Sequence, residues 1–259
     1  MVENIDAIVQ ARLGSSRFPE KLFKPIHGKP LLERCLGQLK KCSKISRIII
    51  ATTTSATDDP IEKYCSNENL LCYRGPVNEV LNRYLGASDK FNSDRFLRVC
   101  SDNPFIDVEL MEDQINAFDP DDDYCSYYTK ADEPIIVKPI GLFVEAVTRE
   151  ALERSISLAN NDPKTQEHVT YYIHSHPDKF KINKLNLPSF INPDLRFTVD
   201  YPDDIAVSEY IIGQTKTINA KSLIDLVQRD NNLSDMILKI TKRYPKLYAP
   251  DEELTRLRS

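Results

Sequence analysis

The chain has 259 residues, of which 41% are hydrophobic, and a formal net charge of −5. This length fits one large α/β domain or two small ones. The negative charge argues against sequence-independent binding of nucleic acid, so an anionic ligand would have to meet a local cluster of cations. The six cysteines form no CxxC pair. With no signal peptide and no membrane-spanning apolar run, we expect a cytoplasmic protein with reduced thiols, no zinc site and no membrane partner.

The first half of the chain alternates short apolar runs with helical patterns. The apolar runs predict buried strands at residues 5–11, 47–52, 70–73 and 95–100. Amphipathic patterns predict helices that begin near Pro30, Asp59 and Val77, and Asp107 is placed as the N-cap of a further helix. Strands that alternate with helices over short connections indicate an α/β fold with a mostly parallel central sheet covered on both faces.

The second half has a less regular pattern. Further strands are predicted directly after residues 121–123 and over 140–147, 180–187 and 195–199. Helices are predicted at 149–159, at 166–175 and in the charged tail from residue 219 onward. The chain has neither internal repeats nor a low-complexity linker, which favours one domain with an embellished second half.

The loop after the first predicted strand, QARLGSSRFPEKLFK at residues 10–24, concentrates positive charge in an acidic chain. It matches neither GxGxxG nor GxxxxGK[ST], which disfavours a dinucleotide fold and a P-loop. A backbone turn at Gly14 could direct amide groups at a phosphate. On charge alone, however, Arg12, Arg17, Lys21 and Lys24 are equally well explained as solvated surface cations.

Polar segments follow other predicted strands as well. The sequence SDNP at 101–104 follows the strand at 95–100, and Asp200 follows the predicted strand at 195–199. Ligands of open α/β sheets bind beyond the carboxyl ends of the strands. Cations on one loop and carboxylates on two others are what a magnesium–nucleoside triphosphate site requires, because Mg²⁺ prefers carboxylate and phosphate oxygens.

Several blocks of the sequence resemble one enzyme family, the cytidylyltransferases that activate acidic sugars, and most closely its spore-coat polysaccharide biosynthesis protein F branch. The blocks are QARLGSSRFPEK (10–21), GKPLLE (28–33), ATT (51–53), DDP (58–60), RGP (74–76), VLNRY (80–84), SDNPFID (101–107), EHVT (167–170) and LRFTVDYPDD (195–204). They span about residues 5 to 215 in consistent order. The resemblance therefore implies a Rossmann-like nucleotidyltransferase domain at 1–215, with a helical C-terminal appendage at 216–259 packed on the same domain.

The resemblance also implies a reaction. CMP would pass from CTP to an acidic sugar or a phosphorylated small molecule in surface polysaccharide or glycoconjugate biosynthesis, with Mg²⁺ as cofactor, pyrophosphate as product and a homodimer as the assembly. Lys21 and Arg12 match the cations that face the triphosphate, and Asp102 and Asp200 match the metal-binding aspartates; these four are the predicted catalytic residues. The predicted nucleotide-binding set is Ala11, Arg12, Leu13, Gly14, Ser15, Ser16, Arg17, Lys21, Arg74 and Asp102.

Evidence for the acceptor side is thinner. Lys138, Glu145, Glu167 and His168 are the predicted acceptor-binding residues, although His168 is equally well explained as a packed or capping residue. The chain departs from the family pattern at three positions. Glu20 replaces a glycine beside the proposed lysine, Ser101 replaces the glycine before the metal-binding aspartate, and Phe143 replaces an aspartate.

Two alternatives stay open at this point. One is an enzyme of similar fold that uses another nucleotide, or a glycosyltransferase with residues 121–123 as its DxD metal motif. The other is a non-catalytic nucleotide-binding relative, for which Glu20 and Phe143 give some support.

Overall fold

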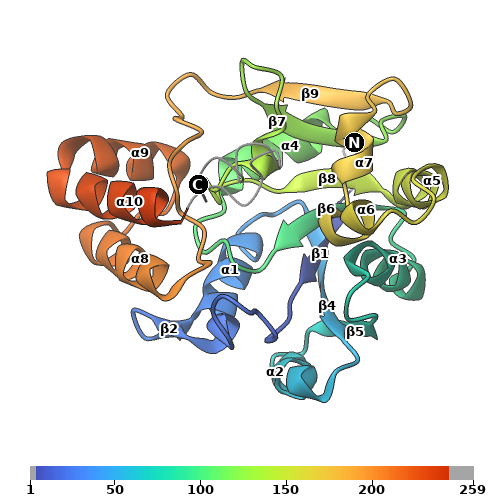
Figure 1. Cartoon of the computed structure of the whole chain (residues 1–259), viewed down its shortest axis with the longest axis horizontal. Helices are drawn as coiled ribbons and strands as arrows, with labels where there is room; N and C mark the ends of the chain where they lie inside the picture. The colour runs from blue at the N-terminus through green and yellow to red at the C-terminus, as the bar shows by residue number, and fades with distance from the viewer. Residues whose placement is uncertain (1–3, 245–259) are drawn as a thin grey trace, which may run out of the picture.

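The computed structural model describes residues 4–244 (Figure 1). Its centre is a seven-stranded sheet in the order β5-β4-β1-β6-β8-β7-β9. The strands are β1 (Ile5–Gln10), β4 (Ile45–Thr53), β5 (Leu71–Gly75), β6 (Arg95–Cys100), β7 (Tyr124–Tyr128), β8 (Glu145–Thr148) and β9 (Ile182–Asn186). A separate two-stranded hairpin joins β2 (Pro25–Ile26) to β3 (Lys29–Pro30). The mostly parallel sheet that the sequence predicts is confirmed.

The direction in which the sheet grows changes beside β1. From β1 the chain adds β4 and then β5 on one side, all parallel, and then crosses to place β6 parallel to β1 on the other side. Loops that leave neighbouring strands in opposite directions open a crevice at such a switch point. The loops after β1 and β6 therefore face each other across the place where a ligand is expected.

Helices cover both faces of the sheet, as the alternating pattern predicts. On one face α1 (Leu31–Leu39), α2 (Asp59–Asn67) and α4 (Val108–Ala117) enclose one apolar core. On the other face α3 (Val80–Phe91) and α5 (Arg149–Leu158) enclose a second core together with the short helices α6 (Pro163–His168) and α7 (Tyr171–Ser175). Short 3-10 helices lie at Lys21–Phe23, Ala56–Asp58 and Ile135–Val137.

Three helices form a cluster beside the sheet. In Figure 1, α8 (Pro202–Gln214), α9 (Ala220–Arg229) and α10 (Asn231–Arg243) lie together on the left. They share an apolar core with side chains of β7 and α4, including Tyr127 and Leu110. The Asp107 carboxylate ties this cluster to the sheet, because it caps α4 by accepting from Leu110 N and also accepts from Ala220 N at 2.5 Å. The predicted cap is confirmed, while the proposed domain boundary at residue 215 stays a prediction.

No helix within residues 4–244 has the length and apolar character needed to cross a bilayer.

Two of the predicted strands are wrong in extent or in kind. The predicted strand at 140–147 is paired only as β8, at Glu145–Thr148, and no strand is present at 195–199. The backbone groups of these segments bond to loops: Phe197 N donates to Pro139 O at 3.1 Å and Val199 N donates to Asp102 O at 2.9 Å. Residues 140–144 and 195–199 therefore form no regular ladder.

The predicted helix at 166–175 is also wrong as a single element. The structure has two short helices, α6 and α7, with Val169 between them in the positive-φ region of a γ-turn, at φ 51° and ψ −66°. A β-branched residue is strained in that region, so only tertiary contacts can hold it there. Val169 is fully buried in the core beneath α3 and α5.

Candidate active site

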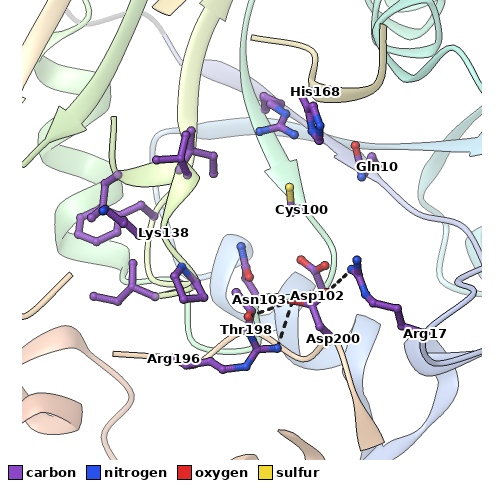
Figure 2. A pocket seen from close by; sticks show the side chains of 18 of the residues that line it. Gln10, Arg17, Cys100, Asp102, Asn103, Lys138, His168, Arg196, Thr198 and Asp200 are labelled. Atoms are coloured by element: carbon purple, nitrogen blue, oxygen red, sulfur yellow. Dashed lines mark hydrogen bonds and ion pairs between the residues drawn. The ribbon is translucent and has the colours of Figure 1, made fainter. Parts of the chain in front are cut away.

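A pocket of about 220 Å³ lies at the crevice beside β1. Its lining comes from the loops after β1 and β6, from the segment 135–141, from α6 and from the extended segment 196–200. In Figure 2, Arg17, Asp102 and Asp200 lie at one end, while His168 and Gln10 lie at the other, with Cys100 between them. Segments far apart in the sequence therefore meet in one pocket, as the spacing of the polar segments predicts.

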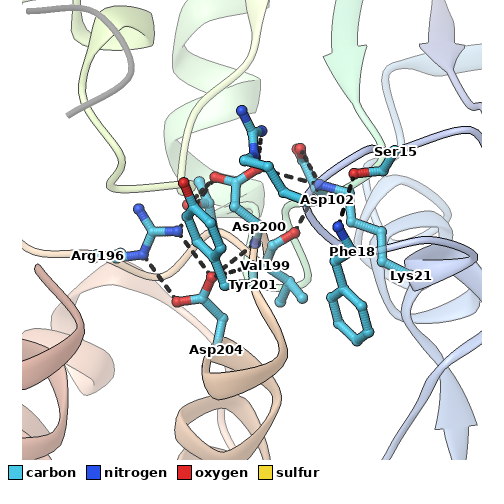
Figure 3. Close-up of polar contacts among 11 residues, drawn as sticks. Ser15, Phe18, Lys21, Asp102, Arg196, Val199, Asp200, Tyr201 and Asp204 are labelled. Carbon is cyan, nitrogen blue, oxygen red and sulfur yellow. Dashed lines mark hydrogen bonds and ion pairs between the residues drawn. The ribbon is translucent and has the colours of Figure 1, made fainter. Parts of the chain in front are cut away.

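Lys21 joins the two predicted metal-binding aspartates (Figure 3). Its Nζ donates to Asp102 Oδ2 at 3.0 Å, to Asp200 Oδ1 at 3.2 Å and to Val199 O at 2.8 Å. The residue is only 7% exposed. Burial disfavours its charged form, yet the two carboxylates outweigh that effect and raise the pKa of Lys21 above its ordinary value. Lys21 is therefore a buried, charged ammonium fixed between Asp102 and Asp200.

Asp200 is the most heavily bonded member of this group. Its Oδ1 also accepts from Arg17 Nη2 at 2.9 Å, and its Oδ2 accepts from Thr198 Oγ1 at 3.3 Å and from Arg196 Nη2 at 3.4 Å. Burial would raise the pKa of Asp200, but the cations around it, Lys21 first among them, lower it below its ordinary value. Asp200 is therefore ionised at neutral pH.

A second buried ion pair positions Asp200, and sequence reasoning did not single it out. Asp204 Oδ2 accepts from the backbone N of Asp200 at 2.8 Å and of Tyr201 at 2.9 Å, and from Arg196 Nη2 at 2.8 Å. Its Oδ1 accepts from Arg196 Nε at 2.9 Å. The carboxylate thus caps the first turn of α8 and fixes the backbone that carries Asp200. Both residues stand in the block LRFTVDYPDD, and an acidic residue three positions after the N-cap is the signal that could have identified the cap.

The positive loop after β1 is held to the neighbouring strand. Leu13 N donates to Asp58 Oδ1 at 2.7 Å, and the other oxygen of that buried carboxylate accepts from Thr53 Oγ1. Arg12 and Arg17 line the pocket, which places two of the predicted cations together. Of the other predicted nucleotide-binding residues in this loop, Ala11 and Leu13 are buried in the core, whereas Gly14, Ser15 and Ser16 lie on the outer part of the loop.

Glu20, which departs from the family pattern, does not compete for the lysine. Its side chain is 69% exposed, and its Oε2 lies 4.0 Å from Lys24 Nζ rather than beside Lys21. The residue has φ 56° and ψ 19°, the left-handed conformation that glycine adopts without strain. The structure therefore explains the family glycine by backbone conformation and leaves the electrostatics of Lys21 intact.

Arg74 lies outside the pocket lining. Its guanidinium donates to the backbone oxygens of Thr53 and Ser55, both at 2.8 Å, and pairs with Asp59 and Glu62. It therefore braces the connection between β4 and α2, and the structure does not bring it to the predicted nucleotide site.

The predicted acceptor residues divide into two groups. Lys138, Glu167 and His168 line the pocket, and Lys138 Nζ also pairs with Glu133 Oε2 at 2.6 Å. Burial is the largest influence on His168 and lowers its pKa, which favours a neutral ring. Glu145 is fully buried beneath the pocket and forms an ion pair with Arg98, which does line it.

Phe143, another of the three departures from the family pattern, closes one wall of the pocket. It lies 4% exposed and packs against Tyr127 with ring centroids 5.1 Å apart. Close by, Gly141 has φ 65°, and a Cβ there would lie 3.0 Å from Thr198 N and 3.1 Å from Asn103 Oδ1. This wall therefore requires both a left-handed backbone and the absence of a side chain at Gly141.

The C-terminal helices also reach the pocket. Tyr244, at the end of α10, lines it and stacks on Tyr201 with ring centroids 3.6 Å apart. Arg17 and Arg196 each lie 5.6 Å from the centroid of the Tyr201 ring. The aromatic pair therefore connects α10 to the cations of the site.

The acidic turn at 121–123 lies elsewhere. Asp123 Oδ2 accepts from Lys181 N and pairs with Arg154 Nη2, both at 2.7 Å, and none of the three aspartates lines the pocket. These contacts fix the turn before β7, so the turn gives no support to a glycosyltransferase metal motif.

Asp102 and Asp200 are the carboxylates that could hold Mg²⁺. Asp102 and Asp200 already share one cation, the Lys21 ammonium, and the Asp102 side chain is 27% exposed. Within residues 4–244 no group of three or more histidine, cysteine or acidic side chains is arranged to hold a metal. Mg²⁺ is usually held by one or two carboxylates together with substrate phosphates, so this pair fits an ion that is shared with a nucleotide.

The sequence of the chain is similar to those of known proteins. A sequence model of the family described as cytidylyltransferase matches residues 7–229. The spore coat polysaccharide biosynthesis protein SpsF of Bacillus subtilis (strain 168) is 30% identical over 232 residues, which cover 86% of this chain and 93% of that protein. The 8-amino-3,8-dideoxy-manno-octulosonate cytidylyltransferase of Shewanella sp. (strain W3-18-1) is 28% identical over 121 residues, 45% of this chain and 48% of that protein.

Solved structures show the same fold. A cytidylyltransferase from Leptospira borgpetersenii superposes with a TM-score of 0.79 at 23% identity, over 89% of this chain and 96% of that chain. A CMP:2-keto-3-deoxy-manno-octonic acid synthetase, solved in complex with CTP, superposes with a TM-score of 0.62 at 14% identity, over 82% of this chain and 99% of that chain.

Proposed function

Because this chain belongs to the cytidylyltransferase family, we propose that it transfers CMP from CTP to an anionic small-molecule acceptor, an acidic sugar or a phosphorylated compound, and releases pyrophosphate. One observation carries the proposal: Lys21, Asp102 and Asp200 form a single ion-paired cluster at the switch point of the sheet, beside the cations Arg12 and Arg17. The names of relatives support a role in surface polysaccharide biosynthesis. A cytoplasmic homodimer stays a prediction of the family resemblance.

The roles follow from charge. An acceptor oxygen would attack the α-phosphorus of CTP, and the bond to the leaving pyrophosphate would break on the opposite side of that phosphorus. Phosphoryl-type transfer depends mainly on positioning and on neutralising charge. Arg12, Arg17 and Lys21 would neutralise the charge that builds on the pyrophosphate. Arg196 and Asp204 would act as positioning residues, because they hold the backbone and carboxylate of Asp200.

Asp102 and Asp200 are the residues that would hold Mg²⁺, which when bound would supply charge neutralisation at the triphosphate. Asp102 is the more accessible of the two, because Asp200 is already bonded to three cations. Lys21 would have to move toward the phosphates as the nucleotide enters.

The test is a pyrophosphate-release assay with CTP, UTP, GTP and ATP, each with Mg²⁺ and a panel of sugar acids and phosphorylated polyols. We expect release with CTP in preference to the other nucleotides, and a loss of about 10²–10³-fold in turnover for Asp102→Asn. Asp225→Asn is the matched control, because that aspartate pairs at the surface with Lys221 and does not line the pocket.

Two results would contradict the proposal. Preference for UTP or a UDP-sugar would indicate an enzyme with another nucleotide. Tight CTP binding without release across the whole panel would indicate a non-catalytic relative. Full turnover of Asp102→Asn with a working acceptor would remove the metal assignment alone.

A further inference from the structure

An arginine lies in the floor of the pocket, inside the sheet. Arg98 belongs to β6, is 7% exposed and lines the pocket. Alternate residues of a strand point to the same face, so Arg98, Cys100 and the pocket end of β6 lie in one row. Arg98 lies four residues before Asp102, on the strand that leads into the turn carrying that aspartate. Both side chains line the same pocket, with Arg98 farther back along β6 than the proposed triphosphate end.

Its counterion is fixed from three sides. Glu145 lies directly opposite Arg98 in the antiparallel pairing of β6 with β8 and is fully buried. Arg98 Nη1 donates to Glu145 Oε2, while Glu145 Oε1 accepts from Tyr124 OH at 2.5 Å and from Thr170 Oγ1 at 2.7 Å. A carboxylate bonded at both oxygens is held in place, and it holds the guanidinium in turn.

One edge of that guanidinium is left over. Within the described part of the chain, the ion pair of Arg98 uses Nη1, and its buried Nε has no hydrogen-bond partner. The remaining edge consists of Nε and Nη2, the side-on fork that matches the two oxygens of a carboxylate. A buried donor without a partner is costly, and because Arg98, unlike other buried arginines with such a donor, lines the pocket, a ligand bound there could supply the partner. Gln10 Oε1, which is also buried at this end of the pocket, has no partner either.

We propose that Arg98 binds the carboxylate of the acceptor through Nε and Nη2, and so selects a sugar acid over a neutral sugar or a phosphate ester. This inference rests on the proposed function. Glu145 then acts as a positioning residue that orients Arg98, which replaces its predicted direct contact with the acceptor. Lys138 is less suited to the role because its ammonium is already paired with Glu133 at 2.6 Å.

The inference is tested by a measurement at the residue itself. The ¹⁵Nε–¹Hε signal of Arg98, assigned by its loss in Arg98→Lys, is followed by NMR during titration with 3-deoxy-manno-octulosonate, gluconate, their methyl esters and glycerol 3-phosphate. We expect the two acids to shift the signal saturably and the esters not to. We also expect Arg98→Lys to lose about 10–100-fold of the preference for acid over ester, the effect of losing one charge-assisted fork.

Arg83→Lys is the matched control. Arg83 is also a fully buried arginine with an unpartnered Nε, but it donates to Pro76 O from α3 and does not line the pocket. The control should lose stability without losing the preference for acids. If Arg98→Lys does not fold, the signal is assigned instead by through-bond correlation to the Arg98 backbone, and the titration of the unaltered protein decides the question.

The outcomes separate this inference from the proposed function. If acids shift the Arg98 signal but CTP yields no pyrophosphate, the carboxylate site stands and the proposed reaction falls. If pyrophosphate is released and Arg98→Lys keeps the same KM for the acid, the carboxylate site is wrong and the reaction stands. A signal that no acid moves, or that only glycerol 3-phosphate moves, also overturns the inference.

Discussion

Asp204→Asn is expected to destabilise the protein strongly although it removes no atom from the core. The Asp204 carboxylate is 3% exposed and accepts four hydrogen bonds, two from Arg196 and one each from Asp200 N and Tyr201 N. An asparagine oxygen in the place of Oδ2 would keep three of these contacts. Its amide nitrogen would then face Arg196 Nε, so that one donor opposes another, and the guanidinium would keep only the longer of its two ion pairs, to Asp200 at 3.4 Å.

The magnitude follows from the burial of the pair. Removing one partner of a buried ion pair costs about 3–5 kcal/mol, because the other charge is left without compensation. For a chain of this size that corresponds to a decrease in Tm of about 6–20 °C. Asp203, the preceding residue, pairs with Arg243 at the surface, where such pairs contribute about 0.2–1 kcal/mol.

The assay is urea denaturation followed by circular dichroism, with Asp203→Asn as the matched control. We expect Asp204→Asn to lower the midpoint with an unchanged slope, and the control to leave it nearly in place. Equal losses of under about 1 kcal/mol in both variants would refute the reasoning, since the buried pair would then be no more important than the exposed one.

Three further predictions concern the site and its surroundings. Lys21→Met should reduce pyrophosphate release with CTP about 10²–10³-fold, and an unchanged rate would show that Lys21 only fills space between the carboxylates. Glu20→Gly should raise the free energy of unfolding by up to about 1 kcal/mol, and with it the urea midpoint, because φ 56° suits glycine. A lower midpoint would contradict this. Burial lowers the pKa of His174 to about 4, below its unfolded value of about 6.5, so protonation favours the unfolded chain. The stability that the neutral ring contributes, up to about 3 kcal/mol, is present above pH 6.5 and lost as the pH falls toward 4. His174→Gln should therefore flatten the dependence of the free energy of unfolding on pH in this range. An unchanged slope would refute the lowered pKa of His174.

The sequence predicts the parallel part of the sheet well. β1 and β6 are almost wholly buried, so each appears as a mainly apolar run, interrupted only at Asp6 and at Arg98 respectively between its ends, with polar residues directly after it. For the same reason the positions of Arg12, Lys21 and Asp102 at the strand ends could be expected without a structure.

Other features depend on contacts that no local pattern records. The segment 195–199 has a strand-like composition, but its backbone amides bond to Pro139 and to Asp102, which are distant in sequence. The break at Val169 is likewise imposed by burial rather than by the residue's own preference.

The role of Arg98 could not be predicted either. Within β6 it looks like one polar residue in a core strand, and Glu145 looks like a free acceptor ligand. Only the strand register, which places Glu145 opposite Arg98, shows that the Glu145 carboxylate is already ion-paired with the arginine.

The ion-paired cluster around Asp200 has a consequence for how a nucleotide would approach. Three carboxylates, of Asp102, Asp200 and Asp204, are matched there by three cations, Arg17, Lys21 and Arg196. A triphosphate that binds to these cations would replace their ion pairs with the aspartates by ion pairs with phosphate oxygens, instead of binding to cations that have no partner. Screening by salt weakens both sides of such an exchange, so affinity should vary less with ionic strength than at a site of unpaired cations. A neutral cluster also projects little field into solvent, so it would not draw in unrelated polyanions.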